Sequence, residues 1–228
     1  MNVDKVDEVD NADESNVDGN NAEEGNMTAE KIIEQAIWAA RSFYDRGKTS
    51  GSSANLSVRL GEDIYITVTG SCFGCLSAAD FVRISRGSPV PGHKKPSREL
   101  PLHLALYGRD ETAGAVIHIH STYATLWSCL PHPDEDDVLP SCTPHLRAKL
   151  GRVASVPYAE PGSEELFAAF RARVGGQNGR EPNGYLLRNH GPIVAGKTLM
   201  DAYFSMEELE DAAKIAWLLK DFPDREKL

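Results

Sequence analysis

The spacing of apolar residues predicts a helix at each end of the folded part of the chain. The first is expected from the capping residue Thr28 to about Arg46, and Gly47 would end it. The second is expected over residues 198–220. In both, apolar side chains recur every three or four residues, which places them on one helix face. They are Ile33, Ile37, Ala40 and Tyr44 in the first helix, and Leu199, Tyr203, Met206, Leu209, Ala213 and Ala216 in the second.

Short apolar runs between these helices predict the strands of a sheet. Residues 56–60 and 64–69 are separated by three turn-forming residues, which is typical of a β-hairpin. Residues 115–120 form a run that reads as a buried strand. Three further strands are expected at residues 80–85, 185–188 and 192–195.

Three shorter helices complete the pattern. They are expected over residues 96–108, over residues 121–129, and from the capping residue Ser163 to about residue 173. Loops are expected at residues 87–95 and 131–145. Helices on a mostly antiparallel central sheet predict a single α/β domain with three layers, α/β/α.

The negative charge of the chain is concentrated at its start. Of the net charge of −10, eight units come from the first 26 residues, which contain nine acidic residues and one lysine. This segment has no aromatic residue and cannot bury enough apolar surface to offset the entropy cost of ordering. We therefore expect residues 1–27 to be a disordered acidic tail and residues 28–228 to form the folded domain.

Composition also narrows the location and the class of partner. The chain lacks the basic start and apolar run of a secretory signal and has no stretch long enough to span a membrane. Its four cysteines do not indicate a secreted disulfide scaffold. These features favour the cytoplasm, without a membrane partner, and the low positive charge argues against nucleic acid as a partner.

Three histidines are the strongest candidates for chemistry. His118 and His120 lie two residues apart in a predicted strand, so both imidazoles would project from the same face. The alternative is a hydrogen-bonded pair of structural histidines. His190 follows another predicted strand and precedes a turn at Gly191 and Pro192. Three histidines with an open fourth position are typical of a catalytic zinc site.

Two other groups of residues are candidates with weaker signals. Cys72 and Cys75 have a C-x-x-C spacing but no matching second pair, so free thiols are favoured over a zinc or redox site. Glu99 is either a surface carboxylate near a helix start or a fourth metal ligand and general base. Small polar residues in three loops could hold a phosphate: Ser52, Ser53, Asn55, Thr69, Gly70, Ser71 and Ser97, with Lys94, Lys95 and Arg98 adding charge.

Several motifs occur in the order found in one known family. The chain resembles the class II aldolase and adducin-head family over about residues 28–220. Within that family it is most similar to the enzymes that decarboxylate a 3-oxo-tetronate 4-phosphate. The motifs are Ser-Ala-Asn-Leu-Ser at 53–57, Ile-Thr-Val-Thr-Gly at 66–70, Pro-Ser-Arg-Glu at 96–99, His-Leu-Ala-Leu-Tyr at 103–107, Ala-Val-Ile-His-Ile-His at 115–120, and Asn-His-Gly-Pro-Ile-Val at 189–194.

The resemblance implies roles for particular residues. His118, His120 and His190 would bind one zinc ion per subunit, or another divalent metal, and Glu99 would bind this metal or transfer a proton. A phosphorylated sugar acid or ketose would be the substrate, in a homotetramer with active sites between subunits. Ser53, Asn55, Thr69, Gly70 and Ser97 would hold the substrate phosphate.

Two departures from the family pattern stand out. Ala54 occupies a position where the family commonly has glycine. Residues 140–145 contain no tyrosine, although relatives place one there that donates a proton to a neighbouring subunit's site. We expect His145 to replace it or the role to be lost.

The implied reaction is loss of CO₂ from the sugar acid through a metal-stabilised enediolate, leaving a triose phosphate. An aldolase of the fuculose or rhamnulose phosphate type, or a pentulose-phosphate 4-epimerase, would use the same residues. A non-catalytic binding module like the adducin head, or a thiol redox protein using Cys72 and Cys75, would be a function of another class.

Overall fold

An eight-stranded sheet forms the middle layer of the computed structural model, which describes residues 27–92, 94–175 and 182–222. The strand order is β4-β3-β2-β1-β5-β8-β7-β6, and within the described residues only β6 and β7 pair in parallel. Apart from Met27, the predicted acidic tail lies outside the described residues. The strands are β1 (Asn55–Leu60), β2 (Asp63–Thr67), β3 (Phe81–Ser85), β4 (Ser88–Pro89), β5 (Ala115–His118), β6 (Val153–Val156), β7 (Gly184–Leu187) and β8 (Gly191–Gly196).

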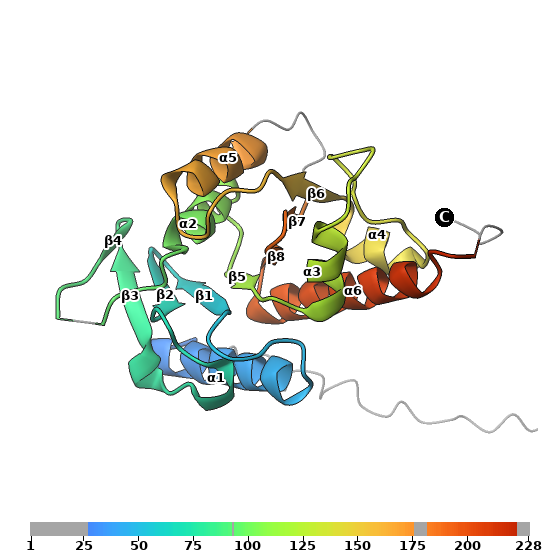
Figure 1. The fold of residues 1–228 in the computed structure, drawn as a ribbon. Coiled ribbons are helices and arrows are strands. Elements are labelled where there is room, and N and C mark those ends of the chain that lie inside the picture. Colours follow the sequence, from blue (N-terminus) through green and yellow to red (C-terminus); the bar gives the residue numbers. More distant parts are fainter. Residues whose placement is uncertain (1–26, 93, 176–181, 223–228) are drawn as a thin grey trace, which may run out of the picture.

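Helices cover both faces of this sheet, which confirms the predicted α/β/α layers (Figure 1). One core lies between the sheet and helices α1, α3, α4 and α6, and a second core lies between the sheet and helices α2 and α5. The sheet is therefore buried on both sides, so a polar side chain within it needs a partner. The helices are α1 (Ala29–Asp45), α2 (Leu100–Arg109), α3 (Thr122–Ser128), α4 (Pro144–Leu150), α5 (Glu164–Gly175) and α6 (Leu199–Leu218).

The caps of the predicted helices are confirmed, and of the four residues predicted to face the core from α1, Ala40 is buried, Ile33 and Ile37 pack against the core, and Tyr44 does not. Thr28 accepts the N–H of Lys31 at the start of α1. Tyr44, placed in the core by its spacing, is 39% exposed, and its ring packs against Gly74. The buried residues are Ala36, Ala39, Ala40 and Phe43.

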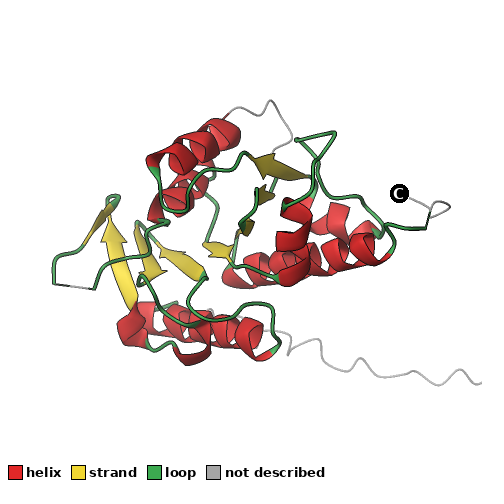
Figure 2. Cartoon of the chain, in the orientation of Figure 1, coloured by secondary structure: helices red, strands yellow, loops and turns green. Residues whose placement is uncertain are grey.

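One α-helix and two strands of the described chain were missing from the prediction. Residues 131–145 were expected to be loop, but α4 begins at Pro144, where a proline fits the first helical turn. The edge strand β6 is only four residues long and pairs with β7 far along the chain, so no local pattern marks it. The two-residue strand β4 was also missed. Figure 2 shows that short helices and loops alternate along the chain between β5 and β6.

The predicted strand at residues 115–120 is shorter than expected. It ends at His118, and His120 lies beyond it in the irregular segment that leads to α3. The first predicted ligand therefore belongs to the sheet and the second does not. Among the described helices, none combines the length and the apolar character needed to cross a membrane.

Candidate metal centre and its cavity

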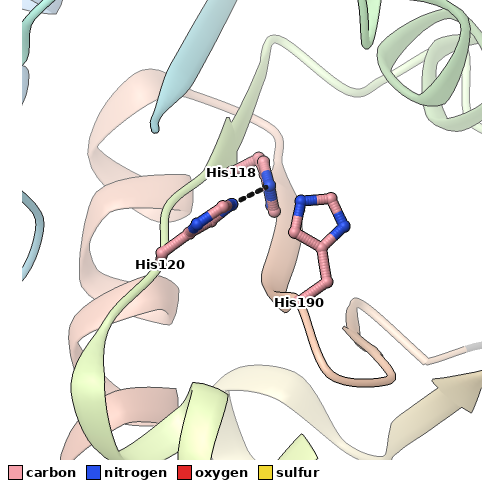
Figure 3. Close-up of side chains that lie close together, drawn as sticks. All are labelled: His118, His120 and His190. Atoms are coloured by element: carbon pink, nitrogen blue, oxygen red, sulfur yellow. Dashed lines mark hydrogen bonds between the residues drawn. The ribbon is translucent and has the colours of Figure 1, made fainter. Parts of the chain in front are cut away.

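Three histidines meet where β5 and β8 lie side by side. His118 pairs with Ile193 across the two strands, His120 follows two residues later, and His190 lies in the turn between β7 and β8. Nε2 of His118 is 3.1 Å from Nε2 of His120, and the three ring centroids are 4.7–5.0 Å apart (Figure 3). One nitrogen from each ring lies within 4.8 Å of the others. The three side chains predicted from sequence are thus brought together at one point.

The Asn-His-Gly sequence explains how His190 reaches this point. Asn189 has a φ of 54°, a left-handed conformation that asparagine tolerates better than most residues. A Cβ atom at Gly191 would lie 2.7 Å from the carbonyl oxygen of Ile119 and 3.2 Å from the ring of His120. Glycine at 191 is therefore required for the two histidine-bearing segments to approach each other.

Glu99 completes the ring of donor atoms. It occupies the N-cap position of α2 and is buried, with its carboxylate facing two of the histidines. Oε2 lies 3.3 Å from Nε2 of His118, and Oε1 lies 3.4 Å from Nε2 of His190. Two ligand atoms that each lie about 2.0–2.1 Å from a tetrahedral zinc ion are about 3.4 Å apart. The spacing of these atoms therefore fits a divalent cation.

The histidines present lone pairs rather than positive charge. Nδ1 of His118 donates to the carbonyl oxygen of Pro192 at 2.8 Å, which leaves Nε2 free to bind a metal. Burial, together with the neighbouring His190, lowers the pKa of His118 to about 3. Burial also lowers the pKa of His120 to about 3. Neutral imidazoles are the form that binds metals.

The buried polar atoms of the site also fit a cation. Oε1 of Glu99 is buried, and among the described residues it has no hydrogen-bond partner. A buried carboxylate oxygen without a partner is costly, and a cation between Glu99 and the histidines would offset that cost. Three imidazoles and a carboxylate suit zinc and other divalent metals of the same series.

A cavity of about 190 Å³ opens beside these donor atoms. Glu99, His120 and His190 line one part of it. All five residues predicted to hold a phosphate line the same cavity, together with Arg98 and Gly162. The five are Ser53, Asn55, Thr69, Gly70 and Ser97.

The five residues differ in how free their side chains are. Asn55 donates its amide to Oε2 of Glu99 at 2.9 Å, so its side chain is engaged with the carboxylate rather than directed at a phosphate. Ser97 accepts the backbone N–H of Glu99, and Ser53 donates to the carbonyl oxygen of Ser50. Thr69 is exposed at the rim. A phosphate role for these five residues stays a prediction.

His145 lies away from this cavity within the chain. It is exposed on α4 near Glu208 on α6. Burial raises the pKa of Glu208, and His145 partly offsets that rise. It is not among the residues that line the cavity. Its predicted role in a neighbouring subunit's site stays a prediction.

The buried residue His103 lies near the site but was not predicted to belong to it. The two cysteines considered as an alternative site lie outside the cavity. His103 is fully buried and hydrogen-bonded to Asn55. Its position four residues after Glu99, about one helical turn along α2, was the signal that could have identified it. Cys72 and Cys75 are free thiols around a single 3₁₀ turn and do not line the cavity.

Comparisons with known proteins show the family of this chain. The family described as Class II Aldolase and Adducin N-terminal domain matches residues 34–217. The chain is 37% identical to the 3-oxo-tetronate 4-phosphate decarboxylase of Escherichia coli (strain K12), over 86% of this chain and 91% of that protein. It is 36% identical to the L-fuculose phosphate aldolase of Methanocaldococcus jannaschii, over 81% of this chain and 94% of that protein.

A solved structure shares the fold as well. The chain resembles the crystal structure of YgbL from Escherichia coli, described as an aldolase, epimerase or decarboxylase, with a TM-score of 0.79 and 36% identity. The similarity covers 86% of this chain and 92% of YgbL. The chain and YgbL therefore share one fold over most of the length of both.

Proposed function

This chain belongs to the class II aldolase and adducin N-terminal domain family as a lyase of the aldolase type, and from that premise we propose that it decarboxylates a 3-oxo-tetronate 4-phosphate. The observation that carries the proposal is the cluster of His118, His120 and His190 near Glu99, beside a cavity lined in part by hydroxyl groups. Several curated relatives at 36–37% identity are named for this reaction.

The metal is proposed to be one zinc ion per chain. His118, His120 and His190 would hold it, with Glu99 as a fourth ligand that can leave. When bound, it would supply Lewis-acid polarisation of the substrate oxygens, which lowers the energy of an enediolate. A non-catalytic module of the adducin-head type would not need this donor set, and the chain retains all of it.

The residues of the chain would position the substrate and move the proton. In a 3-oxo-tetronate 4-phosphate, the bond between C1 and C2 breaks, CO₂ leaves, and the electron pair forms the enediolate across C2 and C3. A proton then returns to C2 and gives a triose phosphate. Glu99 is the acid–base group that the cavity offers for this transfer. Thr69, Gly70 and Ser97 would hold the phosphate through hydroxyl and N–H groups.

Arg98 would add positive charge beside the substrate. It lines the cavity, and its side chain lies next to Gly162, where an added Cβ would be 3.5 Å from that of Arg98. A guanidinium there can attract either the carboxylate or the phosphate of a sugar-acid phosphate.

Aldol cleavage is the second candidate function. The curated relatives named L-fuculose phosphate aldolase are 33–36% identical to the chain. An aldolase also leaves an enediolate, after release of an aldehyde instead of CO₂, so the same metal and Glu99 would serve it. A 4-epimerase would reverse this cleavage within the site.

The assembly is proposed to be a homotetramer in the cytoplasm, with each site completed by a neighbouring chain. His145, exposed on α4, is the proposed residue that reaches across as proton donor. Light scattering with parallel activity measurements tests this: activity should be confined to the oligomer, and a fully active monomer would contradict it.

The test of the reaction is a substrate panel. The full chain, loaded with zinc, is incubated with phosphorylated 3-oxo acids and with ketose 1-phosphates, and CO₂ and aldehyde are measured separately. The proposal expects CO₂ from a 3-oxo-tetronate 4-phosphate and little aldehyde from any ketose phosphate. Aldehyde release without CO₂ would favour the aldolase, and neither product from any compound would refute the lyase.

A further inference from the structure

A continuous chain of buried polar side chains leads from Glu99 away from the cavity. Nδ2 of Asn55 donates to Oε2 of Glu99 at 2.9 Å, and Oδ1 of Asn55 lies 2.5 Å from Nε2 of His103. Nδ1 of His103 lies 2.7 Å from Oγ of Ser57, which lies 2.9 Å from the hydroxyl of Tyr107. Exposure ranges from 0% for Ser57 and His103 to 8% for Glu99, so water does not compete for these bonds.

The chemistry of these groups fixes the direction of donation. Because Asn55 gives its amide N–H to Glu99, only its carbonyl oxygen faces His103, and Nε2 of His103 must carry a proton. Burial lowers the pKa of His103 to about 3, so the ring is neutral and its Nδ1 is an acceptor. Ser57 therefore donates to Nδ1 and accepts from Tyr107. In this series of hydrogen bonds, every O–H and N–H therefore points toward the carboxylate of Glu99.

This direction makes the two oxygens of Glu99 unequal. Oε2 accepts from Asn55, whose amide nitrogen can only donate, so a proton on Oε2 would face another proton. Oε1 has no hydrogen-bond partner in the part of the chain that the structure describes, and it faces His190. Oε1 is therefore the oxygen left to take and return a proton.

We propose that His103 is a positioning residue: it fixes the orientation of the Asn55 amide, which holds Oε2 of Glu99 and leaves Oε1 as the oxygen that moves the proton. Without the donor on His103, the Asn55 amide can rotate and place its carbonyl oxygen against the carboxylate. The inference rests on the proposed function, because it requires Glu99 to transfer a proton in the reaction.

The first test is independent of any substrate. Full-length protein labelled with ¹⁵N-histidine is studied by long-range ¹⁵N–¹H correlation, which reports the protonated nitrogen of each ring. We expect the proton of His103 on Nε2 and that of His118 on Nδ1, because His118 donates to Pro192. Because the two rings should be protonated on different nitrogens, each histidine serves as a reference for the other in the same spectrum. A proton on Nδ1 of His103 would overturn the proposal.

The second test uses three variants of α2. His103→Leu fills the buried space without a donor, His103→Gln retains an amide N–H that can reach Asn55, and Leu102→Ala is a core control on the same helix. We expect His103→Leu to lower kcat about 10- to 100-fold. Its KM should change little, and its metal content should match that of the unmodified protein. His103→Gln should recover most of the loss, and Leu102→Ala should lower the melting temperature but keep kcat.

The outcomes separate this inference from the proposed function. Unchanged kcat in His103→Leu, or a loss in His103→Gln as large as that in His103→Leu, would overturn the positioning role alone. An unmodified protein that turns over no member of the substrate panel would overturn the proposed function and the role of His103 with it.

Discussion

The two halves of the sheet are assembled differently and supply different parts of the candidate site. In the first half, β1, β2, β3 and β4 pair in the order of the chain, and the loops around them line the cavity. In the second half, β5 pairs with β8, which follows it by more than seventy residues, and this pairing brings His118 close to His190. The cavity rim is thus built from local structure, whereas the candidate metal centre depends on long-range pairing.

Glu99 lies at the junction of the two halves. Its neighbour Ser97 is hydrogen-bonded to Thr67 at the end of β2, and Asn55 at the start of β1 holds its carboxylate. Both oxygens face histidines of the second half. We therefore expect residues of the second half to determine metal binding and turnover. Residues of the first half should determine substrate affinity.

The largest effect is expected from removing a histidine of the second half. His120→Ala should release the metal and lower turnover by about 10⁴-fold or more, because the Lewis-acid contribution of several kcal/mol is lost. Elemental analysis and a turnover assay measure the two effects. His132→Ala, a histidine outside the cluster, is the control and should keep both. Full metal content in His120→Ala would remove this residue from the site.

The next largest effect is expected at the junction. Glu99→Gln keeps the shape of the side chain but removes its charge and basicity. We expect the metal to stay largely bound while kcat falls about 10²- to 10⁴-fold, and KM should change less. Glu111→Gln, an exposed carboxylate just beyond the other end of α2, should behave like the unmodified protein. Normal turnover in Glu99→Gln would assign proton transfer to another group, with His145 of a neighbouring chain as the next candidate.

A smaller effect, on substrate affinity rather than on turnover, is expected from residues of the first half. Thr69→Val removes a hydroxyl at the cavity rim without changing the shape of the side chain. If that hydroxyl binds the substrate phosphate, KM should rise about 10-fold with little change in kcat. Thr67→Val is the control, because the hydroxyl of Thr67 accepts the N–H of Leu56 inside the sheet. That variant should lose stability but keep KM. An unchanged KM in Thr69→Val would exclude Thr69 from phosphate binding.

The smallest effect concerns how the second half is held in place. Glu210, buried on α6, accepts the backbone N–H groups of Tyr123 and Ala124 at the start of α3, directly after His120. Glu210→Gln should lower the free energy of unfolding by about 1–2 kcal/mol, because a charged cap at a helix N-terminus is lost. Asp211→Asn, which breaks an exposed ion pair with Lys48, should cost less than about 1 kcal/mol. Equal melting temperatures for the two variants would contradict this account of Glu210.

Each half of the sheet contains one strand that was not predicted from the sequence, β4 in the first half and β6 in the second, whereas the predicted elements have local signals. A hairpin such as β1–β2 and a cap such as Thr28 depend on residues a few positions apart, so their signals are local. The parallel edge strand β6 depends on a partner about thirty residues away, and its four residues carry no periodic signal. The contact of Glu210 with α3 spans more than eighty residues and could not be predicted from local pattern.

The candidate metal centre was predicted from a strand that is shorter in the structure than expected. The two-residue spacing of His118 and His120 predicted that both project from one strand, but the strand ends at His118. The rings still meet, because residue 119 continues alongside β8 through a hydrogen bond from its N–H to Pro192. The engagement of Asn55 with Glu99 was not predicted, since spacing alone does not show which side chain a buried amide contacts.

The central claim is that one divalent metal is held by the three histidines of the second half. Its most direct test is a crystal structure of the zinc-loaded protein with anomalous diffraction recorded on both sides of the zinc absorption edge. We predict a single strong anomalous peak per chain, between Nε2 of His118, Nε2 of His120 and the ring of His190, with Glu99 beside it. A peak at Cys72 and Cys75 instead, or no peak at the histidines in protein that is still active, would contradict the account.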